Sequence, residues 1–340
     1  MKIQQITFTK PYHAEITIED IPMTENSVCV KTMFSSISCG TERANLIGDP
    51  NVNGAGAPSF KFPRCAGYSS SGIVVEVGKN VTSVKVGDRV AGHKSNHRDY
   101  NIVPEDWVVK IEDDRVSLQE AALNYISTFP MAAVRKTRLE LGEPAMVMGL
   151  GILGQFAVIF ARQSGACPLI AADPVAERRE EALRNGADFA LDPLAPDFAE
   201  QVKALTDGGV AAAIEVTGVG AGLDETLDCM RPMGRVALLG CTRDKNFTID
   251  YYRKVHFPGI ELLGAHTCAR PDVESYPGHF THRDDIKAFL KLCAAGRIDV
   301  SSMIKATYSP ADCTEVYSCL AENYTAFPIV AQFDWSKLEG

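Results

Sequence analysis

The chain contains a glycine motif, GLGILG, at residues 149–154, between two segments of opposite character. The residues before it, Ala145–Met148, are all apolar, and residues 152–164 continue with the periodicity of a helix. Asp173 stands 19 residues after Gly154, directly behind a second apolar run, Leu169–Ala172. A strand, a glycine turn, a helix and an acidic residue about 20 positions later form the dinucleotide-binding fingerprint. This combination constrains the fold most, because it requires a parallel sheet with a helix crossing over it.

Each glycine of the motif has its own expected role. Gly149 permits the tight turn, Gly151 lets the backbone approach a pyrophosphate, and Gly154 allows the helix to pack closely on the strand. The helix that follows begins with Ile152 and Leu153, and its N-terminal amides and dipole favour phosphate groups. The motif therefore predicts a nicotinamide dinucleotide at the start of this helix.

Asp173 indicates which dinucleotide binds. A carboxylate at the end of the second strand accepts hydrogen bonds from both ribose hydroxyls and repels a 2′-phosphate, so it favours NAD over NADP. Arg178 either flanks the adenine or ribose or is a solvated arginine on the helix face. We therefore expect NAD as the cofactor.

The surrounding sequence predicts an α/β fold with two domains, as suits a chain of 340 residues. From residue 117 to about 239, apolar runs alternate with amphipathic stretches, which predicts a doubly wound parallel sheet covered on both faces. The first hundred residues are rich in β-branched residues, punctuated by Gly and Pro, and predict a β-rich barrel or sandwich. Two helices, near residues 282–295 and 310–322, and a strand at 327–333 complete the prediction.

Composition excludes several classes of partner. Lys and Arg number 34 against 43 Asp and Glu, a net charge of −9, so no basic footprint exists for a nucleic acid or an anionic membrane. No segment approaches the roughly 20 apolar residues of a membrane span, and the N-terminus does not read as a signal peptide. The ten cysteines are scattered without a CxxC pair, as in a reducing compartment. We expect a cytoplasmic protein with a small-molecule substrate.

Further motifs resemble those of the medium-chain dehydrogenase/reductases, in the branch of the zinc-type alcohol, sorbitol and threonine dehydrogenases. The matching stretches span nearly the whole chain; beside the glycine motif they are CGTE at 39–42, GYS at 67–69, GIVVEVG at 72–78, VGDRV at 86–90, EVTG at 215–218 and residues 234–240. The resemblance implies a GroES-like catalytic domain at residues 1–124 and a Rossmann cofactor domain at 125–265. It also implies a C-terminal return to the catalytic domain at 266–340, and a homodimer or homotetramer.

The same resemblance implies further cofactor-binding residues. On the nicotinamide side of the cofactor they are Thr217, Gly218, Leu239, Gly240 and Cys241. By themselves these residues are strand ends followed by turns, which is where open α/β sheets usually bind ligands.

The zinc ligands of the family are largely replaced in this chain. Cys39 occupies the first ligand position, but the usual Gly-His-Glu reads Gly-Tyr-Ser with Tyr68, and the third position falls at Asn124 or an immediate neighbour. Catalytic zinc needs three firm nitrogen, sulfur or carboxylate ligands. We therefore predict no metal. The alternative is a rearranged site in which His93, His97 or Glu42 joins Cys39.

Without zinc, a side chain must move the proton that accompanies hydride transfer. Thr41 is the first candidate, because the resembling position carries a relaying hydroxyl. Tyr68 is the second, if a cation such as Lys94 lowers its pKa. His93 and Lys94 are further candidates for acid/base groups. The alternatives are non-catalytic roles: Tyr68 is then a buried side chain that fills the zinc cavity, and the histidines are loop residues without a chemical role.

The sequence thus predicts an NAD-dependent alcohol or polyol dehydrogenase that transfers a hydride between NAD and a secondary alcohol, with a polyol, sugar or cyclitol as substrate. The expected substrate pocket contains Cys39, Glu42, His97 and Asn124, and Glu42 could instead simply pair with Arg43. A zinc-free reductase of an activated C=C bond or carbonyl is one alternative. A non-catalytic NAD-binding sensor is the other.

Overall fold

The computed structural model describes residues 1–49, 61–242 and 246–338, which form two compact units. Unit 1 contains Met1–Ile126 and His282–Gly340, and unit 2 contains Ser127–Thr281. Each unit has its own apolar core and is described separately. Among the described residues, no helix is long and apolar enough to cross a membrane.

In unit 2, the described residues form a parallel sheet of six strands in the order β11-β10-β9-β12-β13-β14. The strands are β9 (Ala145–Met148), β10 (Leu169–Ala172), β11 (Phe189–Leu191), β12 (Val210–Glu215), β13 (Met230–Leu238) and β14 (Glu261–Gly264). Counted along the chain this order is 3-2-1-4-5-6, the Rossmann arrangement. The predicted doubly wound sheet is therefore confirmed, and its switch point lies between β9 and β12.

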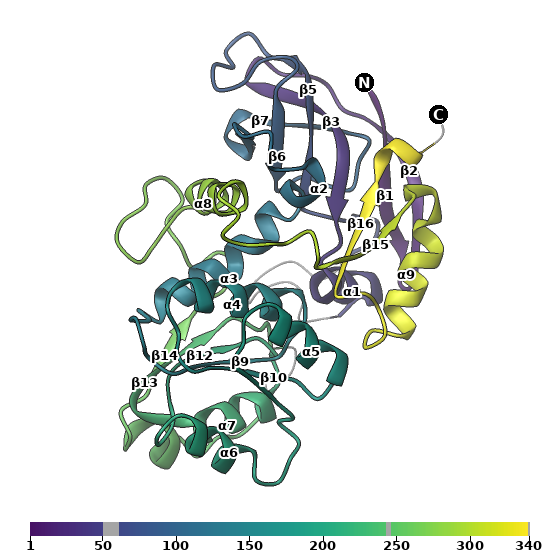
Figure 1. The fold of residues 1–340 in the computed structure, drawn as a ribbon. Helices are drawn as coiled ribbons and strands as arrows, with labels where there is room; N and C mark the ends of the chain where they lie inside the picture. Colours follow the sequence, from purple (N-terminus) through teal and green to yellow (C-terminus); the bar gives the residue numbers. More distant parts are fainter. Residues whose placement is uncertain (50–60, 243–245, 339–340) are drawn as a thin grey trace. The chain divides into compact units, whose positions relative to one another are not determined.

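Helices cover both faces of this sheet. Figure 1 shows α4 (Ile152–Gln163) and α5 (Ala176–Arg184) on one face, and α6 (Phe198–Leu205) and α7 (Gly220–Asp228) on the other. The strands are buried on both sides, which explains why they are continuous apolar runs without alternation. A short π-helix, Tyr252–His256, precedes β14.

Unit 1 is the predicted β-rich domain. Its larger sheet has the order β15-β16-β3-β5-β6-β8, with β7 also pairing β3, and its smaller sheet has the order β2-β1-β4. The larger sheet contains β3 (Ser27–Ser36), β5 (Ser69–Val77), β6 (Arg89–His93), β7 (Tyr100–Pro104), β8 (Val108–Lys110), β15 (Ile304–Tyr308) and β16 (Val330–Asp334). The smaller contains β1 (Lys2–Lys10), β2 (His13–Asp20) and β4 (Arg64–Cys65).

Helices and two cores complete unit 1. The helices are α1 (Cys39–Ile47), α2 (Leu118–Ala121), α8 (His282–Ala294) and α9 (Cys313–Glu322), and α3 (Asn124–Lys136) begins here and continues into unit 2. Valines of β3, β5, β6, β7 and β8 form one core. The other packs α1, α9 and β16 against β1, with Phe8, Tyr317 and Phe333 fully buried at its centre.

The units divide at residues 126 and 281, whereas the sequence placed the divisions at 124 and 265. Residues 266–281 stay with unit 2 because they are tied to α3. Lys136 donates to the carbonyl of Ala269, Arg270 donates to that of Thr128, and the Arg135 guanidinium lies over the Phe280 ring.

Phe198 gives a test of the unit 2 core. Its side chain is 1% exposed and packs among apolar residues of β9, β10, β12 and α7. Phe198→Ala should lower the free energy of unfolding by about 3–5 kcal/mol, because it removes buried area and leaves a cavity. Leu194→Ala, at a side chain that is 78% exposed, is the control and should change it little. Equal shifts of the urea unfolding midpoint in the two variants would contradict this packing.

Candidate functional site

The glycine turn after β9 is fixed by close backbone contacts. Gly149 has a φ of +93°, and a Cβ there would lie 2.9 Å from the Thr217 side chain. A Cβ on Gly154 would lie 1.9 Å from the Gly149 carbonyl oxygen, which no real contact allows. A side chain at either position would clash within the turn, so glycine is required at both for steric reasons. Glycine at these positions lets the start of α4 pack tightly against the end of β9.

Gly151 differs from the other two, because nothing in the described residues lies within 4 Å of a Cβ placed there. It is the N-cap of α4, with a φ of −69° that any residue can adopt. The missing side chain thus leaves open space directly in front of the helix N-terminus, where backbone N–H groups and the helix dipole favour an anion. This is the place in unit 2 that fits a pyrophosphate. Ile152 and Leu153 form the first turn of the helix behind it.

Asp173 follows β10 directly and faces the glycine turn. Its carboxylate accepts hydrogen bonds from the backbone N–H of Leu150 at 2.8 Å and of Val175 at 2.9 Å. Arg178 lies beside it, with 3.8 Å between guanidinium nitrogen and carboxylate oxygen. A carboxylate has about four acceptor positions, so two backbone donors leave capacity for ribose hydroxyls. Arg178 is thus a partner of Asp173 and not the solvated arginine of the alternative reading.

The ends of β12 and β13 form the other side of the switch point. Glu215, the last residue of β12, accepts hydrogen bonds from the N–H groups of Thr217 and Gly218 and from the Thr217 hydroxyl. Burial raises the pKa of Glu215, and these three donors oppose that effect. The buried carboxylate therefore sets the turn at Thr217, and no sequence pattern predicts this role.

The segment after β13 runs against this turn. The N–H groups of Leu239 and Gly240 both donate to the Glu215 carbonyl at 2.9 Å. A Cβ on Gly240 would lie 2.3 Å from the Gly218 nitrogen, and one on Gly218 would lie 2.6 Å from the Cys241 carbonyl oxygen. The five residues that the resemblance assigned to the nicotinamide side thus lie together at the carboxyl edge of the sheet.

In unit 1, Cys39 does not face a set of metal ligands. Its thiol lies near the carbonyl oxygens of Ile37 and Pro328, at 3.9 and 3.8 Å, and the residue is part of the apolar core around Phe8 and Phe333. Among the described residues, no three His, Cys, Asp or Glu side chains converge as metal ligands. The donors at the resembling positions therefore do not fit a catalytic zinc ion, and the rearranged site around Cys39 gains no support.

Glu42 and His97 instead belong to a buried hydrogen-bond network. The carboxylate of Glu42 accepts from the Ser38 N–H at 2.8 Å, from His97 Nε2 at 3.1 Å and from the Tyr317 hydroxyl. Glu42 is not paired with Arg43, which donates to the Ala321 carbonyl. Burial and the Glu42 charge raise the pKa of Tyr317 well above its ordinary value.

The network also indicates which ring nitrogen of His97 donates a hydrogen bond. Its Nδ1 lies 2.7 Å from the Ser35 hydroxyl oxygen, which already accepts from the indole N–H of Trp335 at 2.8 Å. Ser35 can therefore donate its own proton to Nδ1, and Nε2–H then donates to Glu42. A Cβ on Gly67 would lie 2.7 Å from the His97 ring, so the ring occupies the space beside the replaced zinc position. Glu42 and His97 thus belong to a buried structural network, and their assignment to the substrate pocket stays a prediction.

Tyr68 takes part in a short chain of hydroxyls. Its hydroxyl donates to the Ser38 oxygen and also forms a hydrogen bond with Thr41. Burial raises the pKa of Tyr68 above its ordinary value, and the nearby Glu42 and Tyr125 add to this, while Ser38 and Thr41 oppose it. Lys94 is not among the groups that act on Tyr68; its ammonium lies 5.3 Å from the centre of the Trp107 ring. The expected lowering by Lys94 is therefore wrong, and Tyr68 is a neutral phenol.

His93 lies in a cluster of rings that the sequence did not predict. The Tyr125 ring lies at the centre of this cluster. Its centroid is 5.5 Å from that of His93, 5.6 Å from that of Tyr68 and 4.6 Å from that of His282. His93 is buried, and its Nδ1 has no hydrogen-bond partner in the described part of the chain. Tyr125 is the neighbour of the predicted third zinc position, which is the one sequence signal that pointed to it.

Asn124 itself is turned to the backbone. Its Nδ2 donates to the carbonyls of Ala121, Ser70 and Gly92, at 2.8, 2.9 and 3.3 Å. The side chain is fully buried and joins the start of α3 to β5 and β6. Asn124 therefore has a structural role through its Nδ2, and its assignment to the substrate pocket stays a prediction.

Comparisons with known proteins agree with this geometry. Residues 24–113 match the family model described as the alcohol dehydrogenase GroES-like domain, and residues 153–279 match that of the zinc-binding dehydrogenases. L-threonine 3-dehydrogenase of Pyrococcus horikoshii is 29% identical over 299 residues, which cover 77% of this chain and 82% of that protein. D-guloside 3-dehydrogenase of Shigella flexneri is 27% identical over 282 residues, 78% of this chain and 80% of that protein.

Solved structures show the same fold. The chain superimposes on a zinc-binding dehydrogenase from Sinorhizobium meliloti bound to NADP with a TM-score of 0.81 and 22% identity, covering 98% of this chain and 99% of that one. These similarities confirm the predicted combination of a GroES-like domain with a Rossmann-like domain.

His93 gives a prediction on pH dependence. Burial, Lys94 and Arg283 lower its pKa from 6.5 to about 4, and a hydrogen bond to the Trp107 backbone opposes them. As the pH falls below 6.5 the unfolded chain takes up this proton before the folded chain does, so stability present above pH 6.5 is lost as the pH falls toward 4. Between pH 7 and pH 5 this loss should be about 2 kcal/mol.

The measurement is urea unfolding of the wild type and of His93→Phe at both pH values. Phenylalanine keeps the ring contacts and cannot titrate, so the variant should lose less stability than the wild type over this interval. An equal loss in both proteins would show that His93 does not carry the effect.

Proposed function

Because this chain belongs to the medium-chain dehydrogenase/reductase family, in the branch of the zinc-type alcohol dehydrogenases, we propose that it is an NAD-dependent oxidoreductase of secondary alcohols that works without catalytic zinc. The observation that carries the reaction type is the open space in front of the α4 N-terminus, with Asp173 beside it. A polyol, sugar or cyclitol is the proposed substrate class, since relatives act on the 3-position of threonine and of gulosides.

The proposed preference for NAD rests on Asp173. Its carboxylate is held at the glycine turn by two backbone donors, so it cannot turn away from a ribose placed there. A 2′-phosphate would meet this negative charge, whereas ribose hydroxyls would donate to it. Arg178 compensates part of the charge, but as a partner of Asp173 it is already engaged.

The zinc-free mechanism is supported by the donors at the resembling positions. A thiol in the apolar core, a phenol bound to Ser38 and an amide bound to backbone carbonyls do not make three ligands. No step of the proposed reaction therefore passes through a metal.

Bound NAD supplies the hydride acceptor of the reaction. Oxidation of the alcohol must also release the hydroxyl proton, and unit 1 offers Thr41, Tyr68 and Ser38 to receive it. In a chain of hydroxyls each oxygen accepts one proton while it passes its own to the next, and the last hydroxyl of the chain releases its proton to solvent water. Tyr68 thus acts as a neutral relay, which agrees with its raised pKa, and never has to ionise. The reverse order of the same transfers delivers a proton during carbonyl reduction.

A screen of activity tests the proposal. NADH formation should be followed by the absorbance of the reduced nicotinamide, with polyols, sugars and cyclitols as substrates, in the presence and absence of a chelator. We expect turnover that resists the chelator. Tyr68→Phe and Thr41→Val should each lower kcat about 100-fold or more, with dinucleotide binding unchanged. Tyr100→Phe, a half-buried tyrosine of β7, is the matched control.

The possible contrary results are distinct. Turnover that the chelator abolishes would refute the zinc-free mechanism. Tyr68 and Thr41 variants as active as the control would refute the hydroxyl relay. Dinucleotide binding without turnover on any alcohol would favour the non-catalytic sensor or the reductase of activated double bonds.

Asp173→Ser tests the cofactor preference. Loss of hydrogen bonds to a charged acceptor should weaken NAD binding about 10- to 100-fold, and removal of the negative charge should improve NADP binding. Asp192→Ser is the control, because Asp192 pairs with Arg179 at 3.7 Å and takes no part in the glycine turn. Unchanged affinities for both dinucleotides, measured by isothermal titration, would rule out this role of Asp173.

The predicted cytoplasmic location and the homodimer or homotetramer stay predictions.

A further inference from the structure

Unit 2 has a hollow with a volume of about 230 Å³, and no residue of the glycine turn lines it. It lies between the end of α3, the end of β14 and the turn at residues 277–279, and is lined by Arg135, Lys136, Arg138, Leu263, Gly264, Pro277, Gly278 and His279. Three of these side chains are cations and a fourth is a histidine. No Asp or Glu is among the described residues that line it. In a chain of net charge −9 such a lining is unusual and points to an anion.

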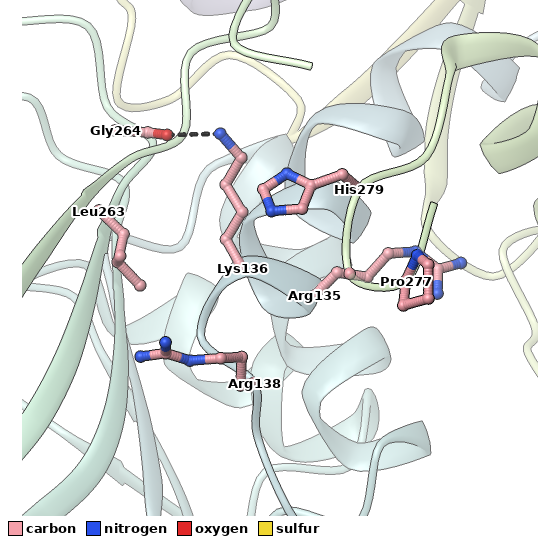
Figure 2. A pocket seen from close by; sticks show the side chains of 8 residues that line it. Arg135, Lys136, Arg138, Leu263, Gly264, Pro277 and His279 are labelled. Atoms are coloured by element: carbon pink, nitrogen blue, oxygen red, sulfur yellow. Dashed lines mark hydrogen bonds between the residues drawn. The ribbon is translucent and has the colours of Figure 1, made fainter. Parts of the chain in front are cut away.

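Lys136 stands in the middle of the hollow, as Figure 2 shows, with its ammonium turned toward Gly264. The ammonium donates to the carbonyls of Gly264 and Ala269, at 2.6 Å each. An ammonium has three N–H donors, so one remains for a further acceptor. Burial and the neighbouring charge of Arg270 lower the pKa of Lys136, which means that the positive charges here are crowded. An anion in the hollow would relieve this crowding.

Arg138 closes one side of the hollow and Arg135 the other (Figure 2). The Arg138 guanidinium pairs with Glu261 at 2.6 Å, but both side chains are about half exposed, so this pair contributes little to stability. The Arg135 guanidinium carbon lies 3.9 Å from the centre of the Phe280 ring, which holds its position. Arg138 can therefore release Glu261 and bind an anion of higher charge, with little loss of folding stability.

We propose that this hollow binds a phosphoryl group, as inorganic phosphate or as a small phosphomonoester. Lys136 and Arg138 supply charge-assisted donors, and Arg forks match the geometry of phosphate oxygens. Leu263 and Pro277 provide apolar walls for the organic part of an ester. None of the residues that line this hollow belongs to the glycine turn at 149–154.

The experiment is isothermal titration of the protein with inorganic phosphate and, separately, with glycerol 3-phosphate at low ionic strength. All variants carry Gly151→Val, because the φ of −69° and the open space at Gly151 accept this side chain, which then obstructs phosphate binding at α4. We expect saturable binding of at least one probe in this background. Tighter binding of the ester would identify a phosphomonoester site, and equal binding would identify a site for free phosphate.

Three substitutions decide whether the hollow is responsible. Arg138→Met and Lys136→Gln should each weaken binding at least tenfold, whereas Glu261→Gln should strengthen it, because it removes the competing carboxylate. Arg115→Met is the matched control, since Arg115 is an exposed arginine paired with Asp113 in unit 1, and it should change nothing. No binding of either probe, or the same affinity in Arg138→Met, Glu261→Gln and Arg115→Met, would overturn the proposal.

Discussion

The buried carboxylate of Glu42 holds together the parts of unit 1 that the chain supplies from both its ends. It binds the N–H of Ser38 before α1, the ring of His97 after β6 and the hydroxyl of Tyr317 in α9. A charge removed from water is stable only when hydrogen bonds compensate it, so these three donors must stay in place. Ser38 is also the acceptor of Tyr68. The arrangement of the hydroxyls proposed to carry the proton therefore depends on this buried carboxylate.

The network occupies the region in which the resemblance to the zinc-type dehydrogenases implies metal ligands. A metal ion joins distant segments through bonds to a few donors. Here hydrogen bonds join them instead, among the side chains of Glu42, His97, Tyr317, Ser35 and Trp335. His97 packs against Gly67, so its ring lies next to the position at which the sequence has Tyr68. The loss of ligands and the gain of this network are thus consistent with each other as parts of one rearrangement.

The fold and the dinucleotide turn were predictable because their signals are local. Gly149 and Gly154 are separated by five positions and interact with each other, and Asp173 follows the next strand. The proton-handling region was predicted less well, because its contacts join distant residues. No pattern near Glu42 in the sequence predicts its hydrogen bond with Tyr317, 275 positions away. No pattern near Lys94 predicts that its ammonium lies over the Trp107 ring. The resemblance points to Asn124 or an immediate neighbour, and the neighbour Tyr125 is the residue that faces Tyr68 and His93.

The chain crosses between the two units twice, near residues 126 and 281, and this affects how the protein emerges from the ribosome. Unit 2 is complete once residue 281 has been made. Unit 1 is not, because β16 pairs with β3 and ends at Asp334, and because Tyr317 must still reach Glu42. During synthesis the first 126 residues therefore present an open sheet edge and an unfilled core, while the later-made unit can already fold. The unit that we propose handles the proton is thus begun first and finished last.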